Sequence, residues 1–185
     1  SELCCILYYE VSEMNVIFLD FDGVVNNLVW FEDENRGLIY NYNKYITITD
    51  ACGGKRHIPI VNDFQAMCWL NQLCKGRDIE IVVTSTWRLH HDYVLALRKG
   101  GLAEKVGIFG CTDCIHTEDY YRDRGREINK FLEEHPDIQN YLILDDEDCF
   151  FDEQKPFFVK CEHNGFNYPE YKKAIDIIAN KWNMC

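Results

Sequence analysis

The chain has 185 residues, a length that suits one domain with a sizeable core. Its composition, 47% hydrophobic and 14% aromatic with four prolines, excludes a disordered or collagen-like chain. The formal charge of −12 and the absence of a Lys/Arg run disfavour extended nucleic-acid binding, although a local group such as Arg122, Arg124 and Arg126 can still bind one phosphate.

The cysteines bear on the cellular compartment. Ten are present, and several, such as Cys68 and Cys74, fall within apolar helical patterns, where a free thiol behaves as a small hydrophobe. We interpret them as mainly reduced and therefore predict a cytoplasmic protein. Cys111, Cys114 and His116 have the spacing of half a zinc site, but no second cysteine pair completes four ligands, so we do not expect structural zinc. No segment approaches transmembrane length, and no membrane contact is expected.

The first predicted strand ends in two acidic residues. Residues 1–13 are expected to be an N-terminal extension or an extra strand, ahead of a single domain over 14–185. An apolar run from Val16 then reaches Asp20, Asp22 and Gly23. Such a run is typical of a strand buried on both faces, and its carboxyl end is where ligands bind in open α/β sheets. Taken alone, the segment could also be a solvated Asp-Gly turn.

Strands and helices alternate along the rest of the chain. We interpret 26–57 as a small β-rich insertion, one or two hairpins, that forms a flap or cap. Its aromatic residues either stack on a substrate ring or pack the hairpin against its own domain: Trp30, Phe31, Tyr40, Tyr42 and Tyr45. Helices are predicted at about 60–75, 89–99, 125–135 and 171–182, and further strands at 79–83, 106–109, 141–144 and 157–159. The alternation predicts an α/β, three-layer, Rossmann-like fold with a mostly parallel central sheet.

Polar clusters follow three of these strands. They are Asp20 with Asp22, Thr84 with Ser85, and Asp145 with Asp146, while Arg124 and its neighbours precede a helix. Parallel neighbouring strands would bring all of them to one crevice. Several carboxylates there would repel one another unless a divalent cation neutralised them, and ligation by oxygen alone suits Mg²⁺.

This order of motifs resembles the haloacid dehalogenase superfamily of phosphohydrolases, over about residues 15–148. Within it, the runs TSTWR, RGREI and LDDEDCF are most similar to the small-capped domain of "Swiss army knife" RNA-repair proteins. The resemblance implies that Asp20 is the nucleophile and Asp22 the general acid/base. Many members have Thr after the DxDG motif, where this chain has Val24.

The resemblance also implies the binding roles. Thr84 would hydrogen-bond the phosphoryl oxygens with help from Ser85, and their order leaves open which hydroxyl belongs to the motif. Gly23 would line the phosphate site. Arg124 would balance the negative charge, with Arg88, Arg122 and Arg126 as rivals, and Arg88 would contribute to phosphate binding. Mg²⁺ would be held by Asp20, Asp22 through its carbonyl, and Asp146, supported by Asp145.

The implied activity is that of a magnesium-dependent phosphatase working through an aspartyl phosphate. Its substrate would be a phosphorylated small molecule or a phosphorylated macromolecular end, such as a nucleotide or a polynucleotide terminus. Two alternatives remain. A noncatalytic domain of this fold could bind a metal or a phospholigand, and a phosphate-accepting receiver domain also places acids at strand ends, although its acid pair precedes its acceptor strand.

Overall fold

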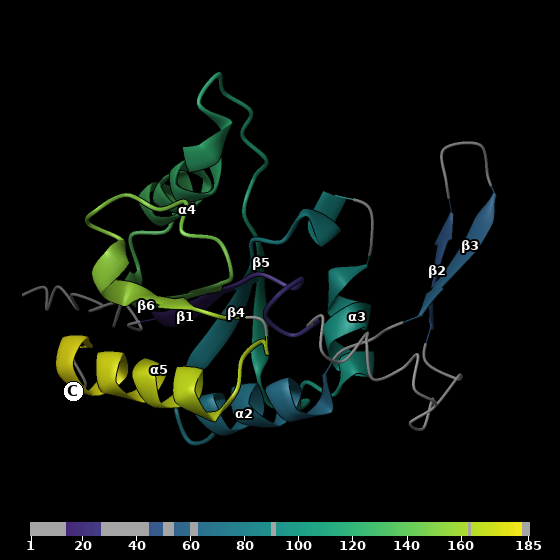
Figure 1. Cartoon of the computed structure of the whole chain (residues 1–185), viewed down its shortest axis with the longest axis horizontal. Coiled ribbons are helices and arrows are strands. Elements are labelled where there is room, and N and C mark those ends of the chain that lie inside the picture. The colour runs from purple at the N-terminus through teal and green to yellow at the C-terminus, as the bar shows by residue number, and fades with distance from the viewer. Residues whose placement is uncertain are drawn as a thin grey trace, which may run out of the picture.

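The computed structural model describes residues 14–26, 45–49, 54–59, 63–89, 92–162 and 164–182. A five-stranded sheet with the order β5-β4-β1-β6-β7 lies at its centre, and every neighbouring pair in it is parallel (Figure 1). Its strands are β1 (Met14–Leu19), β4 (Ile79–Val83), β5 (Gly107–Cys111), β6 (Ile138–Asp145) and β7 (Phe158–Lys160). The prediction of a mostly parallel α/β sheet is therefore confirmed.

Helices cover both faces of the sheet, which gives three layers. They are α2 (Phe64–Cys74), α3 (Tyr93–Gly100), α4 (Asp123–Glu134) and α5 (Tyr168–Lys181), with short 3-10 turns η1 (Thr86–Leu89), η2 (Tyr120–Arg122) and η3 (Lys155–Phe157). Side chains alternate along β1: Ile17 and Leu19 pack in a core with α2, α3 and α5, whereas Val16 and Phe18 pack in a second core with α4. Figure 1 shows α2 and α5 side by side on one face and α4 on the other.

The helix ends explain small differences from the predicted bounds. Asp63 caps α2, since its carboxylate accepts from the Gln65 N–H at 2.8 Å, so the helix begins at Phe64 rather than near residue 60. Gly101, at φ 114°, closes α3, because glycine adopts this left-handed conformation without steric cost.

A second, two-stranded antiparallel sheet pairs β2 (Tyr45–Thr49) with β3 (Lys55–Pro59). It overlaps the stretch 26–57 that we predicted to be a β-rich flap, and β3 ends beyond that stretch, at Pro59. Most of that stretch lies outside the described residues, as do residues 1–13 and the aromatic side chains proposed as a lid, so the flap stays a prediction. In the described part of the chain, no helix combines the length and apolar character needed to cross a membrane.

Candidate active site

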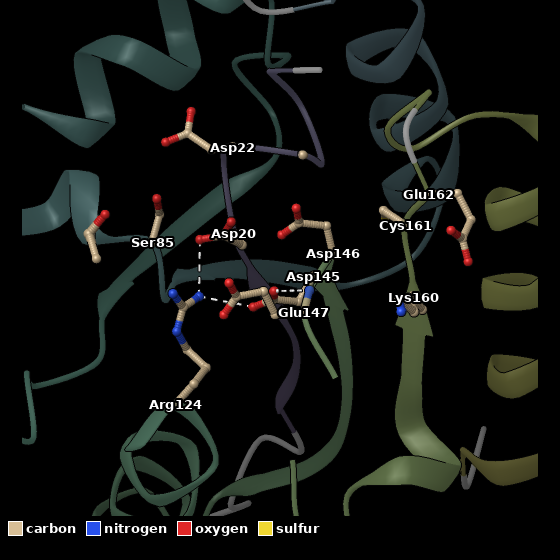
Figure 2. A pocket seen from close by; sticks show the side chains of 12 residues that line it. Asp20, Asp22, Ser85, Arg124, Asp145, Asp146, Glu147, Lys160, Cys161 and Glu162 are labelled. Atoms are coloured by element: carbon tan, nitrogen blue, oxygen red, sulfur yellow. Dashed lines mark hydrogen bonds and ion pairs between the residues drawn. The ribbon is translucent and has the colours of Figure 1, made fainter. Parts of the chain in front are cut away.

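The three predicted polar clusters meet at one edge of the sheet. β1 lies between β4 and β6, with Leu19 paired to Val83 on one side and to Leu144 on the other. The residues that follow these strands therefore line one cavity of about 680 Å³ (Figure 2). Of the predicted site residues, it is lined by Asp20, Asp22, Gly23, Ser85, Arg124, Asp145 and Asp146.

Gly23 allows the loop after β1 to lie against the end of β6. Its φ is +78°, in the left-handed region, and its N–H donates to the Asn26 carbonyl at 2.6 Å. A Cβ at this position would lie 2.2 Å from Asp146 Oδ2. The absence of a side chain at Gly23 is therefore what leaves room for the Asp146 carboxylate.

Arg124 reaches from α4 into the group of carboxylates. Its Nη1 donates to Asp20 Oδ1 at 3.0 Å and to Asp145 Oδ2 at 2.9 Å, and lies 3.3 Å from Thr84 Oγ1. Figure 2 shows the guanidinium directed between the two carboxylates. Burial alone would lower the pKa of Arg124, but Asp20 and Asp145 more than offset that effect and raise it, so the guanidinium stays charged.

The carboxylates nevertheless carry more negative charge than one arginine can neutralise. Burial, reinforced by Asp20, raises the pKa of Asp145 to about 8. Burial and Asp20 also raise the pKa of Asp146, and burial raises that of Asp20 in spite of Arg124. The raised pKa values mean that Arg124 does not fully offset the burial and mutual repulsion of the ionised carboxylates.

These residues fit a divalent cation. Asp20, Asp145 and Asp146 each offer an oxygen, and these oxygens lie within 4.8 Å of one another. With Arg124 charged, the three ionised carboxylates leave two net negative charges, which one Mg²⁺ would balance, and their oxygen ligands suit that ion. Among the described residues, no other group of this kind is found.

Asp22 lies apart from the other carboxylates. Its Oδ2 accepts from Trp87 Nε1 at 2.9 Å and its Oδ1 accepts from Asn26 Nδ2 at 3.2 Å. In Figure 2 its carboxylate points away from Asp20, while both residues line the cavity. Asp22 is therefore held apart from the cluster of Asp20, Asp145 and Asp146, although it follows the same strand, β1, as Asp20.

The two hydroxyl candidates take different positions. Ser85 lines the cavity and hydrogen-bonds Asp20, which acts to lower the pKa of that carboxyl against the effect of burial. Thr84 is fully buried, contacts Arg124 and is not among the lining residues. In this arrangement Ser85 has the better access to a ligand, and the expected primary role of Thr84 remains a prediction.

Arg88 does not enter the cavity. Its guanidinium donates to the carbonyls of Thr84, Ser85, Thr112 and Asp113, and pairs with Glu127 at 2.8 Å. The Arg88 side chain is only 3% exposed, and its bonds link the ends of β4 and β5 to α4. The structure thus gives no support to the predicted phosphate contact of Arg88.

The rival arginines are held elsewhere too. Arg122 and Arg126 lie over the Phe151 ring, at 5.6 and 5.8 Å from its centroid. Arg126 also pairs with Asp119 and Asp123. Of the candidate cations, Arg124 alone lines the cavity.

A close packing contact sets the position of Arg124. A Cβ on the adjacent Gly125 would lie 2.8 Å from Oε1 of Gln154, which is fully buried. Gln154 Nε2 donates to the Gly125 carbonyl at 2.9 Å and to Asn129 Oδ1 at 2.7 Å. This contact fixes the first turn of α4 against the segment after β6, and so places the guanidinium beside Asp145.

Several residues of the site were not predicted from the sequence. Trp87 and Asn26 hold Asp22, Glu127 pairs with Arg88, and five further residues line the cavity: Thr86, Glu147, Lys160, Cys161 and Glu162. Position within the TSTWR and LDDED runs could have indicated Trp87 and Glu147. Lys160 follows from the pairing of β7 with β6, where it lies beside Asp145, and no local pattern indicates it.

A parallel α/β sheet with a DxD pair after its central strand and paired acids after the neighbouring strand defines a domain of the haloacid dehalogenase type. The family model described as "HAD domain in Swiss Army Knife RNA repair proteins" matches residues 16–170, most of the chain. The chain therefore belongs to this family, which suggests a phosphatase-type function. Neither a curated protein nor a solved structure matches the sequence.

Proposed function

We propose that the protein is a Mg²⁺-dependent phosphomonoesterase that forms an aspartyl phosphate on Asp20. The observation that carries the proposal is the Asp20 carboxylate in the cavity, 3.0 Å from Arg124, with oxygens of Asp145 and Asp146 within 4.8 Å. A carboxylate is already ionised when a cation offsets its neighbours, so it needs no base to act as a nucleophile.

In the first step, an Asp20 oxygen forms a bond to phosphorus while the bond from phosphorus to the ester oxygen breaks. The departing oxygen keeps the electron pair and receives a proton from the Asp22 carboxyl group. In the second step, Asp22 takes a proton from a water molecule as that water attacks phosphorus. The bond to Asp20 breaks, inorganic phosphate leaves, and both aspartates return to their starting states.

The remaining residues bind and orient. Arg124 and Ser85 hold the Asp20 carboxylate, and the Ser85 hydroxyl lies where it could also reach a phosphoryl oxygen. Asp20, Asp145 and Asp146 would hold the Mg²⁺, with the Asp22 carbonyl as a further predicted ligand. When bound, Mg²⁺ would screen the negative charges of nucleophile and phosphate as they approach.

The substrate we propose is a phosphorylated nucleic-acid end. The name of the family refers to RNA repair, and the acidic chain disfavours long contacts along a phosphate backbone, so the end group is the part recognised. Nucleoside monophosphates carry the same phosphate monoester, and their rates of hydrolysis should be compared with those of phosphorylated oligonucleotides.

The test is Mg²⁺-dependent phosphate release from an aryl phosphate, nucleoside monophosphates and oligonucleotides phosphorylated at the 3′ or 5′ end. We expect Asp20→Asn to abolish release and Asp148→Asn, which removes an exposed acid outside the cavity, to retain it. Metal-independent release, or release that persists in Asp20→Asn, would contradict the mechanism. Mg²⁺ binding without release from any substrate would favour a noncatalytic phospholigand-binding domain.

A further inference from the structure

Both oxygens of the Asp22 carboxylate are engaged by nitrogen donors, and the two donors come from different segments. Asn26 belongs to the loop after β1, whereas Trp87 lies in η1, after β4. The indole N–H, at 2.9 Å, is the closer of the two. Two donors on separate segments restrict rotation of the carboxylate more than either does alone.

The indole itself is held in place by packing. Its ring lies 5.6 Å from that of Phe21, which has no exposed surface, and it packs against the core on the α2 and α5 face. The Trp87 backbone N–H also lies 3.4 Å from Ser85 Oγ. Because an indole nitrogen can only donate, its contact with Asp22 has a fixed direction.

We infer that Trp87 is a positioning residue, which holds the Asp22 carboxyl group where, in its protonated form, it can deliver a proton to the leaving oxygen. The inference rests on the proposed function. Asp22 stands apart from the three acids that fit a metal, and its orientation away from Asp20 places it where a departing group can lie (Figure 2). Trp87 keeps it there through one hydrogen bond from a rigid ring.

This role makes the contribution of Trp87 depend on the leaving group. A nitrophenolate leaves readily without a proton, whereas an alkoxide such as a ribose oxygen needs one as it departs. Trp87→Phe keeps an aromatic ring beside Phe21 and removes the N–H. We expect kcat/KM to fall about tenfold or more for an alkyl phosphate, the scale of a hydrogen bond to a charged group, and about twofold or less for p-nitrophenyl phosphate.

The test is a double-mutant cycle measured on both substrates. If Trp87 acts through Asp22, the double variant with Trp87→Phe and Asp22→Asn is no slower than Asp22→Asn alone. Trp69→Phe is a matched control, since it also removes an indole N–H, but one that has no hydrogen-bond partner in the described structure and lies outside the cavity. We expect Trp69→Phe to leave kcat/KM unchanged for both the alkyl phosphate and p-nitrophenyl phosphate.

The results separate this inference from the proposed function. Equal losses of Trp87→Phe on both substrates, or losses that multiply with those of Asp22→Asn, would overturn the role of Trp87 while leaving the phosphatase intact. A wild-type protein that hydrolyses neither substrate would overturn both. If Trp87→Phe does not fold, replacing Trp87 alone by 3-benzothienylalanine, which has sulfur in place of the N–H, gives the same comparison with the bicyclic ring kept.

Discussion

Gly23→Ala should weaken metal binding through one misplaced carboxylate. The substitution forces a non-glycine residue to a φ of +78° and places a Cβ 2.2 Å from Asp146 Oδ2. The backbone term alone costs about 1–2 kcal/mol, which lowers Tm by roughly 2–8 °C in a chain of this size. Because that separation is far below van der Waals contact, the Asp146 carboxylate must also leave the position in which it shares the site with Asp20 and Asp145.

Gly76→Ala separates these two effects. Gly76 has a φ of +72°, and a Cβ there would meet nothing within 4 Å, so this variant carries the backbone cost without the collision. We expect both variants to lose stability, but only Gly23→Ala to lose Mg²⁺ affinity, by about 10-fold to 100-fold, the range seen when the supports of a metal ligand are removed.

The assay is isothermal titration with Mg²⁺, together with thermal unfolding in the presence and absence of the ion. Mg²⁺ should raise the Tm of wild type and Gly76→Ala by similar amounts and that of Gly23→Ala by less. Equal Mg²⁺ affinity in the two alanine variants would refute the assignment of Asp146 to the metal.

Three other perturbations test the site. The pKa of Asp145 is about 8 in the folded protein against an ordinary 3.8, so between these pH values the metal-free folded state binds a proton that the unfolded chain does not. The free energy of unfolding of the metal-free protein, measured by urea titration, should therefore fall as the pH rises from about 4 to 8. Asp145→Asn should make this pH dependence weaker. Ser85→Ala should slow turnover by about 10²-fold, the scale of losing one preorganised donor, and a larger loss in Thr84→Ala would return the main phosphate contact to Thr84. Glu127→Gln removes the carboxylate that pairs with buried Arg88 and should cost about 3 kcal/mol of unfolding free energy in urea denaturation; an unchanged midpoint would show that the pair is not needed.

The sheet could be predicted because strands that are buried on both faces are nearly continuous runs of apolar residues in the sequence. The strand from Val16 and the strand over Ile79–Val83 are nearly continuous apolar runs, and polar residues follow them directly. The acids could be placed by the same reasoning, since parallel strands bring their carboxyl ends together, whereas the role of Arg124, on α4, was implied by the family resemblance.

The contacts between side chains that are distant in the sequence could not be predicted, because they depend on how the elements pack. Arg88 and Arg124 are both arginines close to polar motifs, yet one bonds backbone carbonyls and the other meets Asp20 and Asp145. The turn of α4 that carries Arg124 packs on Gln154 through Gly125, a contact between residues 29 positions apart. Trp87 was likewise invisible as a partner of Asp22, 65 positions away.

The central place of β1 in the strand order determines when the site can exist during synthesis. β1 is made before its partner β6, which begins at Ile138, so the apolar stretch Val16–Leu19 waits until α2, β4, β5 and α4 have been made before its second edge is paired. Asp145 and Asp146 come later still. A nascent chain that ends before Asp145 therefore lacks two of the three acids of the cluster and exposes an edge of β1 that is open to wrong pairing.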